Sequence, residues 1–254
     1  MSDISPINDF DAYKHEWNKN SYQQSNNVKK FSLGNKNYNI SHSVIRLKKS
    51  HTPFTKAIVA ICVFLYILQL FIPHISFKLA YHPFWTMFNP WTVLTSGFIH
   101  IGFLHILFNM ITLYYIGGEL EKMLGSLRTG IVYIVSIIGG SALTAAYYML
   151  TSIGANAFTL GASGGIFGIF GAIYVLQKRQ GISTTPMLTL IGLNLAMTFI
   201  IPDIAVMGHI GGLVFGTAMT YILSRPKVYK STSATILSAL PVIIVELLLC
   251  FGFY

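Results

Sequence analysis

Apolar residues are gathered into long runs along most of the chain, and short polar segments separate these runs. A helix of about 20 apolar residues is long enough to cross the hydrocarbon core of a bilayer. Prolines fall at or beyond the ends of the runs, except for Pro241 near the start of the last one, where a missing backbone donor is tolerated. The pattern therefore predicts seven membrane helices, over residues 57–73, 97–117, 129–151, 163–177, 187–202, 206–224 and 236–254.

The composition supports this pattern and sets the first part of the chain apart. Hydrophobic residues make up 53% of the 254 residues and charged residues only 10%, so no water-soluble core is required. The first 50 residues hold no apolar run, and we expect a mostly disordered polar tail, with a small folded cap around Phe10, Tyr13, Trp17 and Tyr22 as the alternative. The predicted protein is all-α and polytopic, with the tail at 1–52, a six-helix core at 53–230 and a seventh transmembrane helix at 231–254.

The charges predict an orientation in the membrane rather than a nucleic-acid partner. The net charge of +9 comes from 17 basic and 8 acidic residues, but the basic residues are spread between the helices instead of covering one face. With the tail in the cytoplasm, the outer connections between the helices hold only one basic residue, Lys78. The positive-inside rule then places the amino terminus inside and the carboxyl terminus outside. Eleven basic residues fall on the inner side: Arg46, Lys48, Lys49, Lys56, Lys122, Arg128, Lys178, Arg179, Arg225, Lys227 and Lys230.

Two polar side chains lie inside apolar runs at the same depth. Ser163 stands in the segment Gly-Ala-Ser-Gly-Gly, and His209 in Gly-His-Ile-Gly-Gly. At about 1.5 Å of rise per residue, Ser163 lies roughly 22 Å above Lys178 and His209 roughly 24 Å above Arg225. Polar groups inside a membrane are expensive and usually functional, so the pair is interpreted as a serine nucleophile and its base.

Glycines on the same two helices indicate a close helix contact. Small residues in one stripe let two membrane helices approach each other. A packing role alone would explain these glycines, but the matched depth of the serine and the histidine favours a catalytic pair. The stripes are Gly164, Gly168 and Gly171 on one helix and His209, Gly212 and Gly216 on the other.

The second predicted helix carries further polar groups. His105 and Asn109 are four residues apart and share a helix face. Their donors, together with the Ser163 backbone N–H, could hold an oxyanion. The alternative is a metal site made by His100, His105 and His209. That site would leave the glycine-flanked serine unexplained, and these helices hold no acidic residue to act as base, so we expect no metal and no cofactor.

In these motifs the chain resembles the rhomboid family of intramembrane serine proteases. The match covers roughly residues 57–224 and rests on four motifs in the family order. They are His100, His105 and Asn109; Gly118-Glu119-Leu120-Glu121-Lys122 followed by Leu124-Gly125-Ser126; Gly161-Ala162-Ser163-Gly164; and His209 with Gly212 and Gly216.

The resemblance implies a fold and a role for each site residue. It implies a six-helix bundle, here with one more helix at the carboxyl end, and a Ser163–His209 dyad without an acid. The oxyanion contacts would come from His105, Asn109 and the Ser163 N–H, and Phe167 would pack on the base. The supporting residues would be Gly161, Gly164, Phe167, Gly212, Gly216, His100 and Glu121, the last hydrogen-bonding near the inner end of the second helix.

Two features depart from the family pattern or add to it. Trp91-Thr92 stands where many members carry Trp-Arg, which puts the usual anchoring of the loop before the second helix in doubt. The seventh helix carries Glu246 near its middle, for which the sequence suggests no role. Cys62 and Cys250 both lie in predicted helices, so a disulfide is not expected.

Three functions fit the sequence. The first is a protease that cuts single-span membrane proteins within or just outside the bilayer, with transmembrane substrates and membrane lipids as its partners. The second is an inactive relative that only binds membrane helices, and the third is a transporter, for which no inverted repeat is found. The abundance of Asn, Ile and Lys favours a bacterial plasma membrane.

Overall fold

The computed structural model describes residues 31–33, 36–38, 51–151, 158–200 and 205–252. The chain divides into two compact units, Met1–His51 and Thr52–Tyr254. In the first unit, strands β1 (Phe31–Leu33) and β2 (Lys36–Tyr38) pair antiparallel, which the sequence pattern did not predict. The four aromatic residues expected in a possible cap lie outside the described residues.

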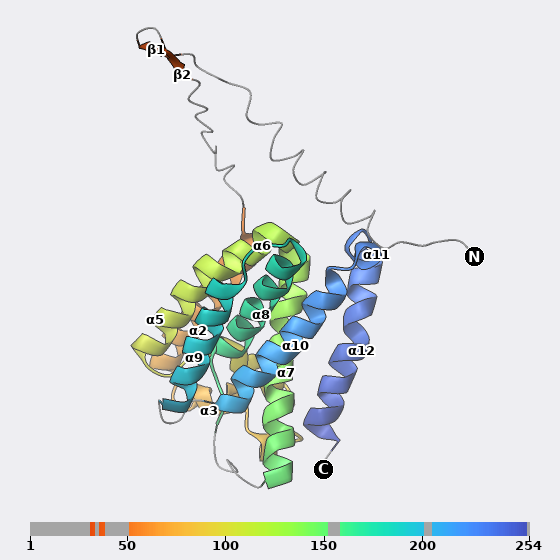
Figure 1. Cartoon of the computed structure of the whole chain (residues 1–254). Helices are drawn as coiled ribbons and strands as arrows, with labels where there is room; N and C mark the ends of the chain where they lie inside the picture. The colour runs from red at the N-terminus through yellow and green to blue at the C-terminus, as the bar shows by residue number, and fades with distance from the viewer. Residues whose placement is uncertain (1–30, 34–35, 39–50, 152–157, 201–204, 253–254) are drawn as a thin grey trace, which may run out of the picture. The chain divides into compact units, whose positions relative to one another are not determined.

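The regular elements in the described part of the second unit are all helices (Figure 1), apart from an isolated bridge between Tyr81 and Thr159. Five helices are long and apolar enough to cross a membrane, and α8 and α9 are shorter at 17 and 16 residues. The predicted all-α polytopic membrane fold is therefore confirmed, and each of the seven predicted runs corresponds to a helical segment among the described residues. They are α2 (Pro53–Phe71), the continuous α5 (Phe103–Thr112), η3 (Leu113–Gly117) and α6 (Gly118–Leu124), α7 (Ser126–Thr151), α8 (Ser163–Arg179), α9 (Thr185–Ile200), α10 (Val206–Leu223) and α12 (Thr232–Phe251).

Short helices fill the connections. The segment between α2 and α5 holds α3 (Ile75–Leu79), η1 (Pro83–Trp85), α4 (Thr92–Thr95) and η2 (Ser96–Phe98), and α11 (Pro226–Tyr229) joins α10 to α12. The second membrane helix begins at Phe103 and not at residue 97 as predicted, because Gly102 has a φ of +79° and interrupts the helical backbone. His100 consequently lies in a loop and not on a helix.

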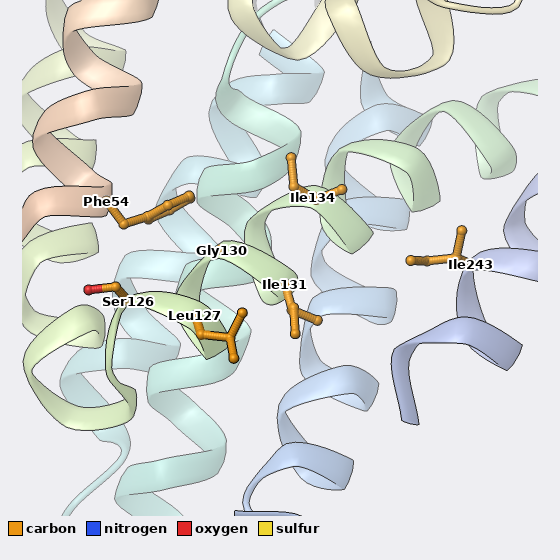
Figure 2. Close-up of a pocket in the computed structure, with 7 residues that line it drawn as sticks. All are labelled: Phe54, Ser126, Leu127, Gly130, Ile131, Ile134 and Ile243. Carbon is orange, nitrogen blue, oxygen red and sulfur yellow. The ribbon is translucent and has the colours of Figure 1, made fainter. Parts of the chain in front are cut away.

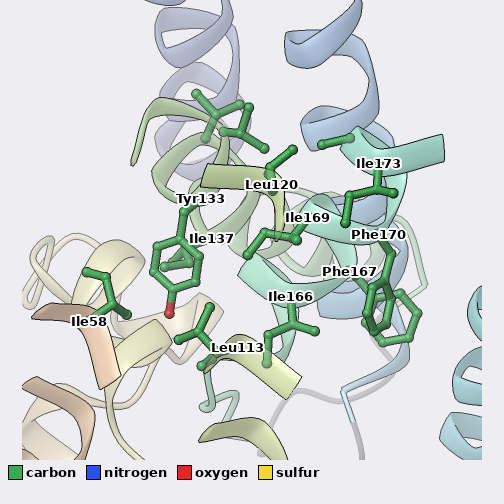
Figure 3. Packing of buried hydrophobic residues seen from close by; sticks show 14 of the residues in the cluster. Ile58, Leu113, Leu120, Tyr133, Ile137, Ile166, Phe167, Ile169, Phe170 and Ile173 are labelled. Carbon is green, nitrogen blue, oxygen red and sulfur yellow. The ribbon is translucent and has the colours of Figure 1, made fainter. Parts of the chain in front are cut away.

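Helices α7, α8 and α10 form the centre of the bundle. Helix α10 packs against both α7 and α8, and α12 lies along α7 (Figure 1). The main cluster of buried apolar side chains joins α7 and α8 to η3 and α6, as Figure 3 shows around Tyr133, Ile166 and Ile169. The Tyr133 hydroxyl donates a hydrogen bond to the Gly97 carbonyl at 3.2 Å, so the core also holds the connection before α5.

Helix α12 buries its one acidic residue. Glu246 is fully buried, and neither carboxyl oxygen has a hydrogen-bond partner among the described residues. Cys250, one turn further on, packs with Tyr81, Ile138 and Ala142. Cys62 and Cys250 are both free, as expected.

A groove of about 320 Å³ lies between α2, α7 and α12 (Figure 2). Its wall is almost entirely apolar, and neither Ser163 nor His209 lines it. The groove is therefore separate from the predicted catalytic pair. It is lined by Phe54, Ser126, Leu127, Gly130, Ile131, Ile134 and Ile243.

Glu121 caps the start of α2. One carboxylate oxygen accepts hydrogen bonds from the Phe54 N–H at 2.9 Å and the Ser126 hydroxyl at 2.6 Å, and the other accepts from the Thr55 N–H at 2.8 Å. The first N–H groups of a helix have no partner within the helix, and a carboxylate also interacts favourably with the positive end of the helix dipole. A buried glutamate thus joins the first two membrane helices.

We expect Glu121→Ala to lower the free energy of unfolding by about 2 to 4 kcal/mol, because it removes three charge-assisted hydrogen bonds at a buried position. Thermal or denaturant unfolding in detergent would measure the loss. Glu119→Ala is the matched control, since Glu119 is exposed and contacts only Lys122 in a surface ion pair, and its effect should stay below about 1 kcal/mol. Equal losses in the two variants would contradict a capping role.

Candidate active site

Ser163 and His209 meet at the starts of two neighbouring helices. Ser163 is the first residue of α8, and His209 lies in the first turn of α10. The Ser163 Oγ and the His209 Nε2 are 2.7 Å apart, within hydrogen-bond distance. The imidazole is buried and the hydroxyl is partly exposed. The two residues that the sequence paired from their depth are therefore in direct contact.

Glycine-to-glycine contacts bring the two helices together. A Cβ atom on Gly212 would overlap the backbone of Gly164, and one on Gly216 would overlap the backbone of Gly168. Helix α7 enters the same contact through Ser136, whose hydroxyl fills the space beside Gly168 and Gly216. The close approach predicted from the glycine spacing is confirmed, and it sets the separation of the two helices that carry Ser163 and His209.

Phe167 covers one face of the imidazole. Its ring is stacked on His209 with a centroid distance of 4.5 Å and an interplanar angle of 21°. Phe167 is buried one turn after Ser163 on α8. The contact restricts rotation of the imidazole, as expected for the aromatic position of the family motif.

The other ring nitrogen of His209 has a partner that the sequence analysis did not single out. The His209 Nδ1 is 2.8 Å from the Thr198 Oγ1 on α9. The Thr198 hydroxyl also donates to the Asn194 carbonyl at 3.0 Å. The sequence does show Thr198 as another polar side chain inside an apolar run. It gave no prediction, because a threonine hydroxyl in a helix commonly bonds to the carbonyl one turn earlier and then needs no other partner.

The segment that leads into Ser163 is held on several sides. Thr159 and Tyr81 exchange two backbone hydrogen bonds, and the Gly161 N–H donates to the Ser96 carbonyl at 2.9 Å. Gly161 has a φ of +117°, and a side chain there would collide with the His105 imidazole. This segment therefore requires glycine at position 161 for both its backbone and its close contact with His105.

Aromatic rings pack around Phe158, at the beginning of the segment that leads to Ser163. The Phe158 ring contacts those of Phe77, His82 and Trp85 at centroid distances of 5.4, 4.9 and 5.8 Å. Burial lowers the pKa of the His82 imidazole, which favours its neutral form in this cluster. The connection between α2 and α5 thus supports the approach to Ser163.

His100 contacts the residue before Ser163. Its Nε2 accepts a hydrogen bond from the Ala162 N–H at 3.3 Å. Gln69 of α2 fixes His100 in turn, because its side-chain amide accepts from the His100 N–H and donates to the His100 carbonyl. Gln69 was not predicted, since a single glutamine in an apolar run gives no indication of its partner.

His105 and Asn109 lie one turn apart on α5, and His105 is the one that lies against the segment leading to Ser163. The His105 ring stands edge-on to His100 at 5.0 Å, and it lies against Gly161. Asn109 is buried, and its amide donates to the His105 carbonyl at 2.9 Å. An amide nitrogen carries two donor hydrogens, so one remains for another acceptor.

The geometry does not favour the metal alternative. Among the described residues, no group of three His, Cys, Asp or Glu side chains is arranged to hold a metal ion. The Nε2 atoms of His100 and His209 instead bond to Ala162 and Ser163.

The loop that lacks the Trp-Arg pair has other anchors. The Trp91 indole N–H donates to the Lys78 carbonyl at 2.8 Å, and the buried Thr92 hydroxyl donates to the Asn89 carbonyl at 2.6 Å. Thr95 bonds to the Leu79 carbonyl at 2.9 Å. Hydrogen bonds within the segment before α5 therefore hold this loop in place.

Comparisons with known proteins agree with the motifs. The sequence matches the Rhomboid domain over residues 87–226. It is 30% identical to RHOMBOID-like protein 2 of Arabidopsis thaliana over 153 residues, which cover 57% of this chain and 46% of the relative. It is 34% identical to Rhomboid protease GluP of Bacillus subtilis over 161 residues, which cover 60% of this chain and 30% of the relative. The chain thus spans less than half the length of these relatives.

Proposed function

The chain belongs to the rhomboid family, and we propose that it is an intramembrane serine endopeptidase with Ser163 as nucleophile and His209 as general base. The observation that carries this proposal is the 2.7 Å contact between the Ser163 Oγ and the His209 Nε2. A serine hydroxyl is a weak nucleophile until an adjacent base removes its proton. The contact supports the assignment of His209 as this base in a multi-pass membrane protein.

The proposed reaction has two steps. The Ser163 Oγ attacks the scissile carbonyl while its proton passes to His209. His209 then gives the proton to the departing amine, the peptide C–N bond breaks, and an acyl-enzyme remains. Water, deprotonated by the same imidazole, attacks the ester carbonyl, and the imidazolium then returns the proton to the departing Ser163 Oγ, which releases the carboxylic acid and the free serine. His209 thus acts as base and acid in each step.

The negative charge of the tetrahedral intermediate has donors nearby. The Ser163 N–H is at the start of α8, where backbone donors have no partner within the helix. The His105 imidazole, which lies against Gly161, and the second N–H of the Asn109 amide one turn further along α5 would supply the other donors. Donors arranged before the reaction begins stabilise developing charge without reorganisation.

Substrate and orientation are further parts of the proposal. We propose that the substrates are single-span membrane proteins, cleaved within or just outside the bilayer. Arg128 and Arg179 lie at the same end of the bundle, because Arg128 bonds to the Tyr229 carbonyl and Arg179 to the carbonyls of Ser224 and Tyr221. By the positive-inside rule, this basic end supports a cytoplasmic amino terminus. The carboxyl terminus would then lie outside, in the bacterial plasma membrane that the composition favours.

A fluorophosphonate probe tests the activity most directly, since it reacts with an activated serine. We expect the detergent-solubilised protein to be labelled at Ser163 and to cleave a single-span test substrate. A folded protein that neither reacts with the probe nor cleaves the substrate would instead be an inactive rhomboid-like protein that binds membrane helices.

The oxyanion donors are expected to give graded losses. Asn109→Ala and His105→Ala each remove one donor while the Ser163 N–H stays in place, so each should lower turnover by about 10- to 1000-fold. Labelling by the fluorophosphonate should slow but continue in both. Full turnover in either variant would make that side chain a packing residue only.

A further inference from the structure

We infer that Thr198 is a positioning residue that fixes the tautomer of His209, so that the relay has three members: Ser163, His209 and Thr198. The inference rests on the proposed function, since it concerns the base of that reaction. It adds a residue from α9, a helix that carries none of the family motifs found in the sequence.

The hydrogen bonds around Thr198 define which atom carries the proton. A threonine hydroxyl has one hydrogen to donate and can accept as well. The Thr198 hydroxyl donates its hydrogen to the Asn194 carbonyl. With that hydrogen on the Asn194 carbonyl, the hydroxyl accepts at its 2.8 Å contact with His209, and we assign the ring hydrogen to Nδ1.

This assignment leaves the His209 Nε2, which contacts Ser163, unprotonated and able to act as base. A neutral imidazole has one protonated and one unprotonated nitrogen. With the hydrogen on Nδ1, the lone pair of Nε2 faces the Ser163 Oγ and can accept its proton. The other tautomer would present an N–H to Ser163 and could not act as base.

The contact is also the main polar attachment of α9 to the site. Met187 and Thr198, near the two ends of α9, are the only buried residues among those described on this helix. Thr198 is 3% exposed, while most of the residues between them face outward. The position of α9 therefore bears directly on the orientation of the base.

The side-chain hydroxyl can be tested with closely matched variants. Thr198→Val keeps the shape and removes the acceptor, whereas Thr198→Ser keeps the hydroxyl. Thr220→Val is the control, because Thr220 is equally buried and also donates to the carbonyl four residues earlier, but it lies away from the site on α10. A general effect of losing a buried threonine hydroxyl would appear in both valine variants.

We expect Thr198→Val to lower kcat by about 10-fold with KM changed by less than about twofold. Thr198→Ser should restore most of the lost kcat, and Thr220→Val should leave it unchanged. A kcat for Thr198→Val equal to that of the wild type would overturn the inference. So would a loss of equal size in Thr220→Val.

A second measurement does not depend on activity. ¹⁵N NMR of histidine-labelled protein reports which ring nitrogen is protonated, and we expect a protonated Nδ1 on His209 in the wild type and a mixture of tautomers in Thr198→Val. The same tautomer populations in both proteins would refute the positioning role, even in an active protease. If the tautomer changes as expected but the wild type does not react with a fluorophosphonate, the proposed protease function fails and the role of Thr198 stands.

Discussion

Ser163→Ala is expected to abolish cleavage of a single-span test substrate, with residual activity below about one percent of the wild type, because the variant has no hydroxyl to form the acyl-enzyme. Labelling by a fluorophosphonate should also disappear. The fold should persist, since Ser163 lies at the start of α8 and its hydroxyl bonds only to His209 in the described structure. Substrate cleavage and unfolding temperature, measured on the same detergent preparation, would separate the two effects.

Ser238→Ala provides the matched control. Ser238 lies on α12 and its hydroxyl bonds to the Thr235 carbonyl, away from the site. This variant should keep full activity. Cleavage that survives in Ser163→Ala would assign the nucleophile to another residue.

The second large effect concerns the base. We expect His209→Ala to lose activity as fully as Ser163→Ala, because an unassisted serine hydroxyl is a poor nucleophile at neutral pH. The double variant should be no worse than either single variant, since residues that act as one unit give non-additive losses. Rates from one cleavage assay on all four proteins provide the comparison.

Losses that add in the double variant would mean that the two residues work separately. His82→Ala is a useful companion, because His82 is also a buried histidine but packs on Phe158 and has no contact with Ser163. We expect His82→Ala to retain measurable turnover, in contrast to His209→Ala.

The sequence predicted the helices and the central pair for separate physical reasons. Each membrane helix needs a long apolar run, so the seven runs could be counted, and the starts of α8 at Ser163 and of α10 at Val206 agree with the predicted 163 and 206. Ser163 and His209 stood out because polar groups inside hydrocarbon need a reason to be there. Their equal depth followed from the fixed rise of a helix.

Other parts of the site depend on how helices rotate against each other, which no single run encodes. Thr198 and Thr220 look alike in sequence, and both bond one turn back along their helices. Only the placement of α9 beside α10 gives Thr198 a second contact. Gln69 and Tyr81 were missed for the same reason, because their partners lie 31 and 78 residues away in the chain.

The start of the second membrane helix was not predicted from the sequence pattern. The shift of the second membrane helix from 97 to Phe103 follows from one glycine with a positive φ, Gly102, in a segment whose apolar character alone suggested continuity. That shift places His100 in a loop, where it can reach the Ala162 N–H. An apolar run therefore identified the membrane segment but not where its helix begins.

The relay of Ser163, His209 and Thr198 consists of groups that carry no formal charge at rest. In the proposed mechanism, the attack creates an imidazolium and an oxyanion a few ångströms apart, with no carboxylate among the described neighbours of the imidazole to share the positive charge. The energy of such a charge separation depends strongly on the dielectric constant around it. Dissolved salt screens mainly charges that are exposed and about 10 Å or more apart, so the reaction barrier would be governed by the polarity and hydration around Ser163 and His209 and hardly at all by ionic strength.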